Sequence, residues 1–150
     1  MDSGVRWARI FASLLVLLSI LNLVSCGPEA GEIVLSRPDE YRYVFEAKEA
    51  FVLKAIVLIF EEKSLGQNVI VDREKQTVAT DYIVQNDWRI KALAQVKRLN
   101  WKETEVLLSV TSERKTGNGW EGRRLLEKEQ YMRIFSVIES KVYEEMYRAD

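Results

Sequence analysis

The sequence predicts an α+β domain in which an antiparallel sheet of about four or five strands has two helices packed on one face. The first supporting observation is a series of segments between residues 41 and 116 in which apolar and polar side chains alternate. The other two are an apolar segment at 47–65 and an amphipathic segment at 123–148, both with apolar residues at helical spacing. Strands grouped between helices are typical of an α+β fold.

The expected strands alternate most regularly in the second half of the chain. There, one face of a strand carries Ile90, Ala92, Ala94 and Val96, and one face of the next carries Val106, Leu108 and Val110. Polar turns at 73–75 and 100–103 indicate two β-hairpins. One apolar and one polar face indicate a sheet with one side in solvent. The five expected strands cover residues 41–45, 68–72, 76–84, 88–99 and 104–116.

The two expected helices differ in character. Residues 47–65 have a wide apolar surface, which indicates burial on more than one side or contact with a partner or a membrane, and Gly66 is the expected left-handed cap. Residues 123–148 carry a single apolar stripe. Between the last expected strand and the last expected helix, residues 115–122 contain three glycines, which predicts a loop. Trp120 in this loop is expected either to cover a binding site or to fold back onto the core.

Composition argues against most enzyme classes. The chain has 150 residues and a formal net charge of −1, which fits one globular domain and gives no reason to expect a nucleic-acid partner. It contains no His and one Cys, so the commonest general base is missing and no intrachain disulfide or multi-Cys metal site can form. Phosphate-binding, serine-nucleophile and metal-ligand motifs are also missing. We therefore expect no catalytic activity, no cofactor and no metal site.

The first 25 residues have the layout of a secretory signal peptide. Arg6 and Arg9 precede an uncharged segment at 10–25, which is 16 residues long and shorter than the ~20 residues of a membrane-spanning helix. The segment ends in Leu23-Val24-Ser25-Cys26, which resembles the bacterial lipobox. In lipoproteins this Cys receives a diacylglycerol, a peptidase cleaves before it, and the new amino group is acylated. The resemblance thus implies lipidation of Cys26; the alternative is an uncleaved N-terminal anchor.

The predicted organisation is a signal peptide at 1–25, a tether at 26–40 and a single α+β domain at 41–150. The tether holds both prolines and a short apolar run at 33–35 that could pair as an edge strand. The lipobox resemblance implies a protein of the bacterial cell envelope, anchored to a membrane by its lipid. Because residue 27 is Gly rather than Asp, it further implies the outer membrane, facing the periplasm, in a host with two membranes.

The order of elements resembles the helix-grip domains of BamC-type lipoproteins, components of the outer-membrane protein assembly machine. The resemblance covers residues 41–148. It is carried by the helix ending at Leu65-Gly66, the strand at 68–72, the polar turn into 77–80, the charged strand at 89–97 and the last helix. Those proteins have two such domains and a long N-terminal segment, whereas this chain has room for one domain and a short tether.

The functional prediction is an envelope lipoprotein that acts without catalysis, through protein–protein contact or as a structural accessory of an envelope assembly. Its expected partners are the membrane, through the lipid anchor, and an envelope protein. The alternative is a carrier or binder of a lipid or other apolar ligand. A possible binding surface combines basic and aromatic side chains, which suit lipid headgroups or an acidic partner and are otherwise a solvated strand face: Trp88, Arg89, Lys91, Trp101 and Trp120.

Overall fold

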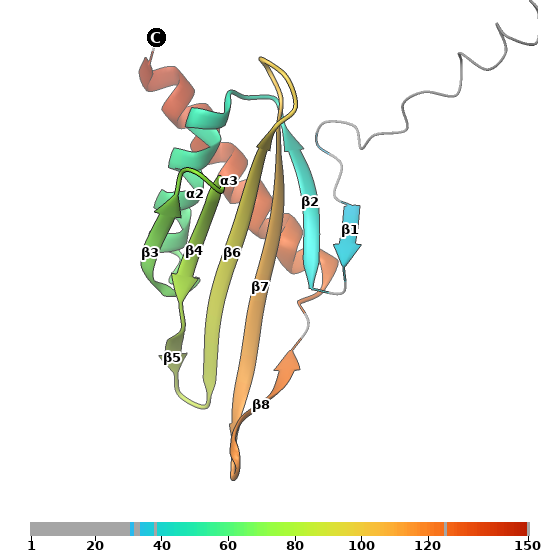
Figure 1. The fold of residues 1–150 in the computed structure, drawn as a ribbon, viewed down its shortest axis with the longest axis vertical. Helices are drawn as coiled ribbons and strands as arrows, with labels where there is room; N and C mark the ends of the chain where they lie inside the picture. Colours follow the sequence, from blue (N-terminus) through green and yellow to red (C-terminus); the bar gives the residue numbers. More distant parts are fainter. Residues whose placement is uncertain (1–30, 32–33, 38, 125, 150) are drawn as a thin grey trace, which may run out of the picture.

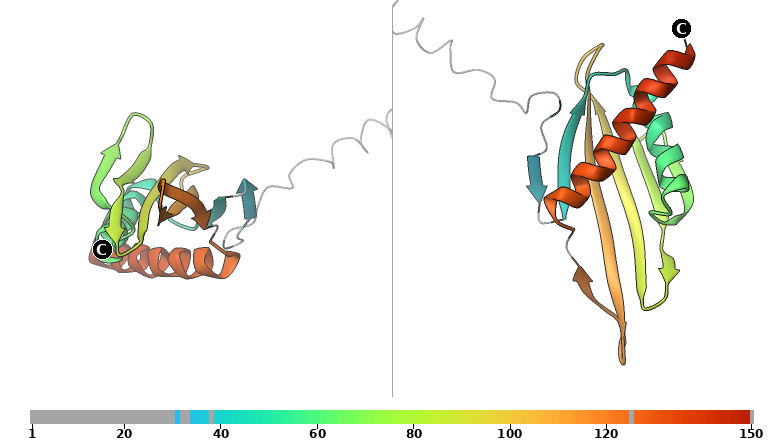
Figure 2. Two further views of the ribbon diagram at one scale, coloured as in Figure 1. Left: turned by 90° about the horizontal axis from the view of Figure 1, so that it is seen from below. Right: turned by 180° about the vertical axis from the view of Figure 1, so that it is seen from behind.

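The domain has two layers, a twisted antiparallel sheet and two helices that cover one of its faces (Figures 1 and 2). The computed structural model describes residues 31, 34–37, 39–124 and 126–149. The predicted signal peptide and Cys26 lie outside these residues. The α+β class and the placement of both helices on one face of the sheet are confirmed.

The sheet is larger than expected, with eight strands among the described residues. Their order is β1-β2-β7-β6-β4-β3, while β5 extends along β6 and β8 extends along β7. The helices are α2 (Glu49–Glu62) and α3 (Lys128–Ala149). The strands are β1 (Val34–Arg37), β2 (Glu40–Phe45), β3 (Gln67–Asp72), β4 (Thr77–Asp81), β5 (Ile83–Gln85), β6 (Trp88–Arg98), β7 (Thr104–Thr116) and β8 (Gly119–Arg124).

The long hairpin of β6 and β7 forms the centre of the sheet. The two strands pair without interruption from Trp88 opposite Arg114 to Arg98 opposite Thr104. The predicted alternation is confirmed, because the buried apolar residues of both strands face the helices: Ala92, Ala94, Val96, Val106, Leu108 and Val110. The helices fill the other side of this core with Val52, Ile56, Ile59, Phe60, Tyr131, Phe135, Ile138 and Val142.

The predicted loop at 115–122 is wrong, because β8 pairs with β7 there. Only Gly117 and Asn118 separate the two strands, and Thr116 lies opposite Gly119. A two-residue connection that contains Gly is typical of a tight hairpin, and it lets the chain return along β7. The strand extends to Arg124, so the last helix begins at Lys128 rather than at residue 123.

Two other segments differ from the prediction. The expected strand at 76–84 is divided at Tyr82 into β4 and β5, which both pair with β6. Strand β1 lies within the predicted tether and pairs with β2, so Val34 and Leu35 of the apolar run belong to an edge strand, while residue 33 lies outside the described residues. Both differences raise the number of strands, and all of the pairs remain antiparallel.

The end of α2 also differs from the prediction. The helix stops at Glu62, and the left-handed residue is Ser64, with φ of 51°, rather than Gly66. Gly66 is needed for a different reason. A Cβ atom at this position would lie 1.9 Å from Oγ1 of Thr80 in β4. The missing side chain therefore allows the chain that leaves α2 to approach the sheet closely.

Tyr131 fixes α3 to the sheet where β7 changes its neighbour. Strand β2 pairs with β7 up to Ser109, and β8 pairs with it from Ser112. In the gap, the N–H of Val110 donates to the Tyr131 hydroxyl at 2.9 Å, and this hydroxyl donates to the carbonyl of Asp39 at 2.8 Å. Burial raises the pKa of Tyr131 to about 12, so the hydroxyl keeps its proton at neutral pH.

Charged contacts join α2 and α3. Glu145 of α3 is buried and forms ion pairs with Lys54 of α2 and with Arg148, the latter at 3.0 Å. Lys141 lies 3.5 Å from Glu62 of α2. The hydrogen bonds from Lys54, together with the nearby positive charges, lower the pKa of Glu145. These pairs fix the register of one helix against the other.

We predict that Tyr131→Phe destabilises the domain by about 1–3 kcal/mol, because the buried N–H of Val110 loses its acceptor. The measurement is urea unfolding monitored by circular dichroism. Tyr147→Phe on the same helix is the control, since Tyr147 is 85% exposed. Equal stability of the two variants would show that the hydroxyl of Tyr131 contributes nothing.

Candidate functional site

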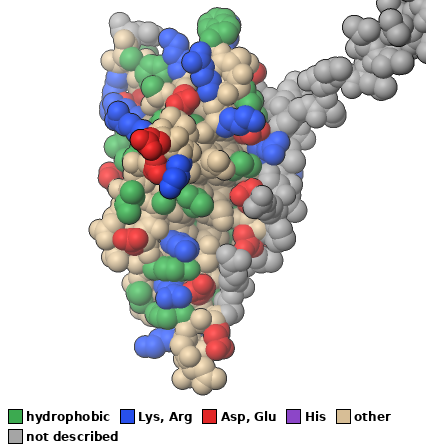
Figure 3. Space-filling model, in the orientation of Figure 1, with side chains coloured by type: hydrophobic (Ala, Val, Ile, Leu, Met, Phe, Trp, Pro, Cys, Tyr) green, Lys and Arg blue, Asp and Glu red, His purple; other side chains and the backbone are tan. Residues whose placement is uncertain are grey.

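The helix-free face of the sheet presents a mixture of basic, acidic and apolar side chains (Figure 3). Residues of β6 that alternate with the buried ones point to this side, namely Arg89, Lys91, Leu93, Gln95 and Lys97. Leu93 is 47% exposed near the middle of the face. Two further exposed apolar side chains, Ile70 of β3 and Val84 of β5, lie on flanking strands.

Arg89 contacts a carboxylate and two aromatic rings on this face. Its Nε atom donates to Glu113 Oε2 at 2.6 Å across the β6–β7 pair. Its guanidinium carbon lies 4.2 Å from the ring centre of Tyr82 and 5.1 Å from that of Trp120. Lys91 contacts the same tyrosine, with Nζ 4.6 Å from the ring centre. Two cations, two aromatic rings and one carboxylate thus form a cluster, here called the arginine cluster, on β6, β7, β8 and the break between β4 and β5.

Glu113 holds the arginine cluster together. Besides the Arg89 contacts, Glu113 Oε1 accepts a hydrogen bond from the Tyr82 hydroxyl at 3.0 Å. Burial alone would raise the pKa of Glu113, but the hydrogen bonds from Arg89 and Tyr82 and the positive charge of Arg89 outweigh it and lower the pKa. The carboxylate is therefore ionised at neutral pH and restrains the guanidinium in one orientation.

The structure brings together three of the five predicted surface residues and separates the other two. Arg89, Lys91 and Trp120 belong to the arginine cluster. Trp88 points to the opposite face of the sheet, in phase with buried Ala92, at the end that extends beyond the helices. Its ring lies 5.9 Å from the guanidinium of Arg114. Trp120 lies within β8 opposite Lys115, in a hairpin strand rather than in the predicted glycine loop.

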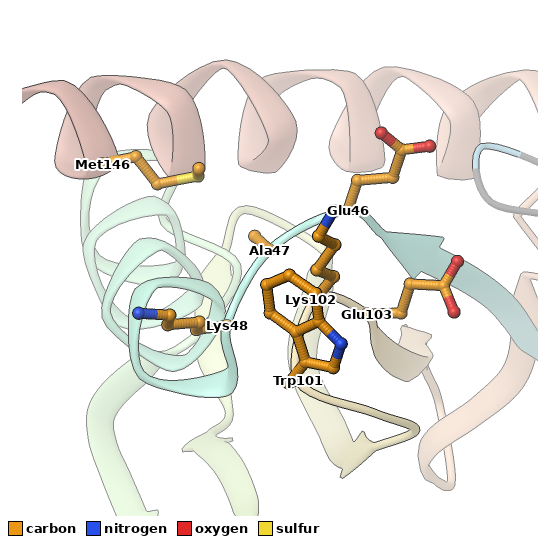
Figure 4. A pocket seen from close by; sticks show the side chains of 7 residues that line it. All are labelled: Glu46, Ala47, Lys48, Trp101, Lys102, Glu103 and Met146. Atoms are coloured by element: carbon orange, nitrogen blue, oxygen red, sulfur yellow. The ribbon is translucent and has the colours of Figure 1, made fainter.

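Trp101 lies at the other end of β6, in the turn that connects it to β7. It is 65% exposed, and Nζ of Lys102 lies 4.4 Å from its ring centre. A groove of about 480 Å³ opens beside it, lined also by Ala47 and Lys48 before α2 and by Met146 of α3 (Figure 4). Asn100 shapes the turn, since its Oδ1 accepts the N–H groups of Lys102 at 2.8 Å and Glu103 at 2.9 Å.

Sequence reasoning missed Tyr82 and Glu113, the residues that organise the arginine cluster. Tyr82 was expected inside one continuous strand, and Glu113 lies 31 residues further along the chain. In the structure, the numbers of residues paired between β6 and β7 add to 202, so Glu113 lies opposite Arg89. The predicted turn at 100–103 would instead pair residue 99 with 104 and place Arg114 opposite Arg89. The predicted hairpin therefore locates Glu113 only to within one residue.

The described residues contain no group of three or more His, Cys, Asp or Glu that could hold a metal ion. In the same part of the chain, no helix has the length and apolar character needed to cross a membrane. Comparison of the chain with protein-family models and with curated proteins finds no match.

We predict that Glu113 stabilises the fold in a pH-dependent manner. Its pKa in the folded state is below the ordinary value of 4.5, so its contribution is complete above that pH and is lost as the pH falls through the folded-state pKa. Wild-type protein should therefore lose more stability than Glu113→Gln between about pH 5 and pH 3. Chemical unfolding at each pH measures the difference.

The control for this prediction is Glu121→Gln in the neighbouring strand β8, where the side chain is exposed. It should follow the wild-type pH profile. A wild-type profile parallel to that of Glu113→Gln would contradict the role given to Glu113.

Proposed function

We propose that this protein is a membrane-anchored envelope lipoprotein that acts through protein–protein contact, without catalysis. The observation that carries the proposal is the position of the single cysteine. Cys26 ends the apolar N-terminal segment in the lipobox-like sequence Leu23-Val24-Ser25-Cys26. Two or three acyl chains on this residue give stable anchoring, whereas one chain gives only marginal binding.

The helix-free face of the sheet supports the contact part of the proposal. One face of the sheet is covered by α2 and α3, while the other presents Leu93, Ile70 and Val84 together with the arginine cluster. Arginine and aromatic side chains are enriched at protein interfaces. Glu113 and the two rings already restrain Arg89, so this side chain would lose little conformational entropy when a partner binds.

The space between the helices and the sheet gives little support to the alternative, a carrier of an apolar ligand. Such a carrier needs an apolar cavity large enough to enclose its ligand. Here the interior is filled by side chains that are fully buried, among them Phe45, Phe60, Phe135, Tyr131 and Leu108. The larger hollows, of about 480 and 560 Å³, are open grooves at the edges of the domain.

The anchor is tested by intact mass measurement of the protein from a membrane fraction. Wild-type protein is expected to begin at Cys26 and to carry the added mass of acyl chains. Cys26→Ala is expected to remain uncleaved and to carry no acyl mass. A wild-type protein that keeps residues 1–25 and matches the variant would refute the anchor.

The contact surface is tested by photo-crosslinking in living cells, with the reactive amino acid placed at Leu93 or at Met132. These residues have nearly equal exposure, 47% and 45%, but lie on the helix-free face and on α3, respectively. We expect a discrete crosslinked protein band from position 93 and little from position 132. The same pattern from both positions, or a band from 132 alone, would exclude the helix-free face as the contact surface.

A further inference from the structure

The turn between β6 and β7 has the composition of a membrane-contacting tip. Leu99 is 42% exposed and Trp101 is 65% exposed. Residues 97–103, here called the hairpin tip, carry three positive charges, on Lys97, Arg98 and Lys102, against one negative charge on Glu103. Two further carboxylates lie beside the tip: Glu105 is opposite Lys97 across the β6–β7 pair and forms an ion pair with Arg42, and Glu46 lines the groove beside Trp101. Exposed aromatic and aliphatic groups among cations suit the headgroup region of a bilayer with anionic lipids.

The described chain enters the domain at the same end as the hairpin tip. The N–H of Gly31 donates to the carbonyl of Val44 at 3.0 Å, near the end of β2. The next residue of that strand, Phe45, pairs with Thr104, which pairs in turn with Arg98 at the base of the tip. Gly31 therefore lies at the same height along the sheet as Lys97, which is in line with Val44 across β7. From Lys97 to Trp101 the tip extends four residues further, or about 13 Å at the rise of a β-strand.

The distance from the proposed lipid anchor to this end is short. Five residue steps separate Cys26 from Gly31, and a fully extended chain covers at most about 17 Å in that number of steps. The longest possible distance from Cys26 to Gly31, about 17 Å, is therefore close to the distance of about 13 Å by which the tip extends beyond Gly31. A lipid on Cys26 leaves little room between the bilayer and the end of the domain that carries Trp101.

We propose that the hairpin tip rests in the headgroup region of the anchoring membrane, with Leu99 and Trp101 inserted among anionic lipids. This inference depends on the proposed lipid anchor. The tether supplies a high local concentration of the tip at the bilayer, so even a weak contact is populated. The cations of the tip face lipid phosphates, and Asn100 holds the turn in shape through its two backbone hydrogen bonds.

This docking places the arginine cluster away from the membrane. The cluster lies toward the opposite end of the sheet, beside the β5–β6 turn and the β7–β8 hairpin (Figure 1). Strand β6 alone, with eleven residues, is about 33 Å long. A partner that binds the cluster would thus approach well above the lipid surface.

The test is fluorescence quenching of the purified acylated protein in vesicles of phosphatidylethanolamine and phosphatidylglycerol with brominated acyl chains. The mature chain from Cys26 contains three tryptophans, of which only Trp101 lies at the membrane end. We expect quenching in wild-type protein and in Trp88→Phe, and loss of most of it in Trp101→Phe. Lys97→Glu combined with Lys102→Glu should reduce it as well.

The outcomes separate this inference from the proposed function. An acylated, vesicle-bound wild-type protein that shows no quenching, or quenching that Trp101→Phe leaves unchanged, would overturn the docking and leave the anchor intact. A purified protein without acyl mass would overturn the anchor and the docking together. Quenching that survives reversal of both lysine charges would exclude anionic headgroups as the partner of the tip.

Discussion

The hydroxyl of Tyr131 bridges the gap in the sheet where β7 has no neighbouring strand on one side. Strand β7 is too long for a single neighbour on that side, so β2 covers its first half and β8 its last residues. Between them a backbone N–H would be buried without an acceptor, at a cost of about 1–3 kcal/mol. Because Tyr131 comes from α3, the group that completes the sheet also positions the helix that covers it. Tyr41 packs against the same ring, with the ring centres 4.4 Å apart.

The two faces of the sheet differ in composition. The face toward α2 and α3 is apolar and filled, so it accounts for stability. The other face carries charged and aromatic side chains, among them a guanidinium in contact with two rings. A cation–π contact at such a half-exposed site contributes roughly 0.5–1 kcal/mol. The arginine cluster is therefore better suited to presenting an ordered surface than to holding the fold together.

The sequence was most informative where side-chain period alone determines the structure. Alternation over residues 88–116 predicted both central strands and their buried faces, because a one-residue shift of register would turn every apolar side chain to solvent. It was least informative where a short turn decides the path. Gly117 and Asn118 suit a loop and a tight hairpin equally well, and the pairing with β7 that selects the hairpin is a tertiary contact.

The candidate site shows the same limit. Arg89 and Lys91 were recognisable as basic residues of a strand. Because side chains alternate between the two faces of a strand, residues two apart lie on the same face. Trp88 and Trp101 are also close to Arg89 and Lys91 in sequence. Trp88 is the neighbour of Arg89 in the strand, so its side chain points to the opposite face of the sheet. Trp101 lies beyond the other end of β6, so the length of that strand separates it from Arg89. Tyr82 and Glu113 required knowledge of which strands are neighbours.

The sheet extends past its helices at one end, so the backbone hydrogen bonds of the sheet are more exposed to solvent there than under the helices. Residues 92–96 and 104–110 lie largely under α2 and α3, whereas residues 114–119 of the β7–β8 hairpin are exposed. Local opening starts where few apolar contacts cover the backbone hydrogen bonds. The backbone hydrogen bonds of the strands under the helices are therefore the better protected ones, and those next to the β7–β8 turn are the first to open.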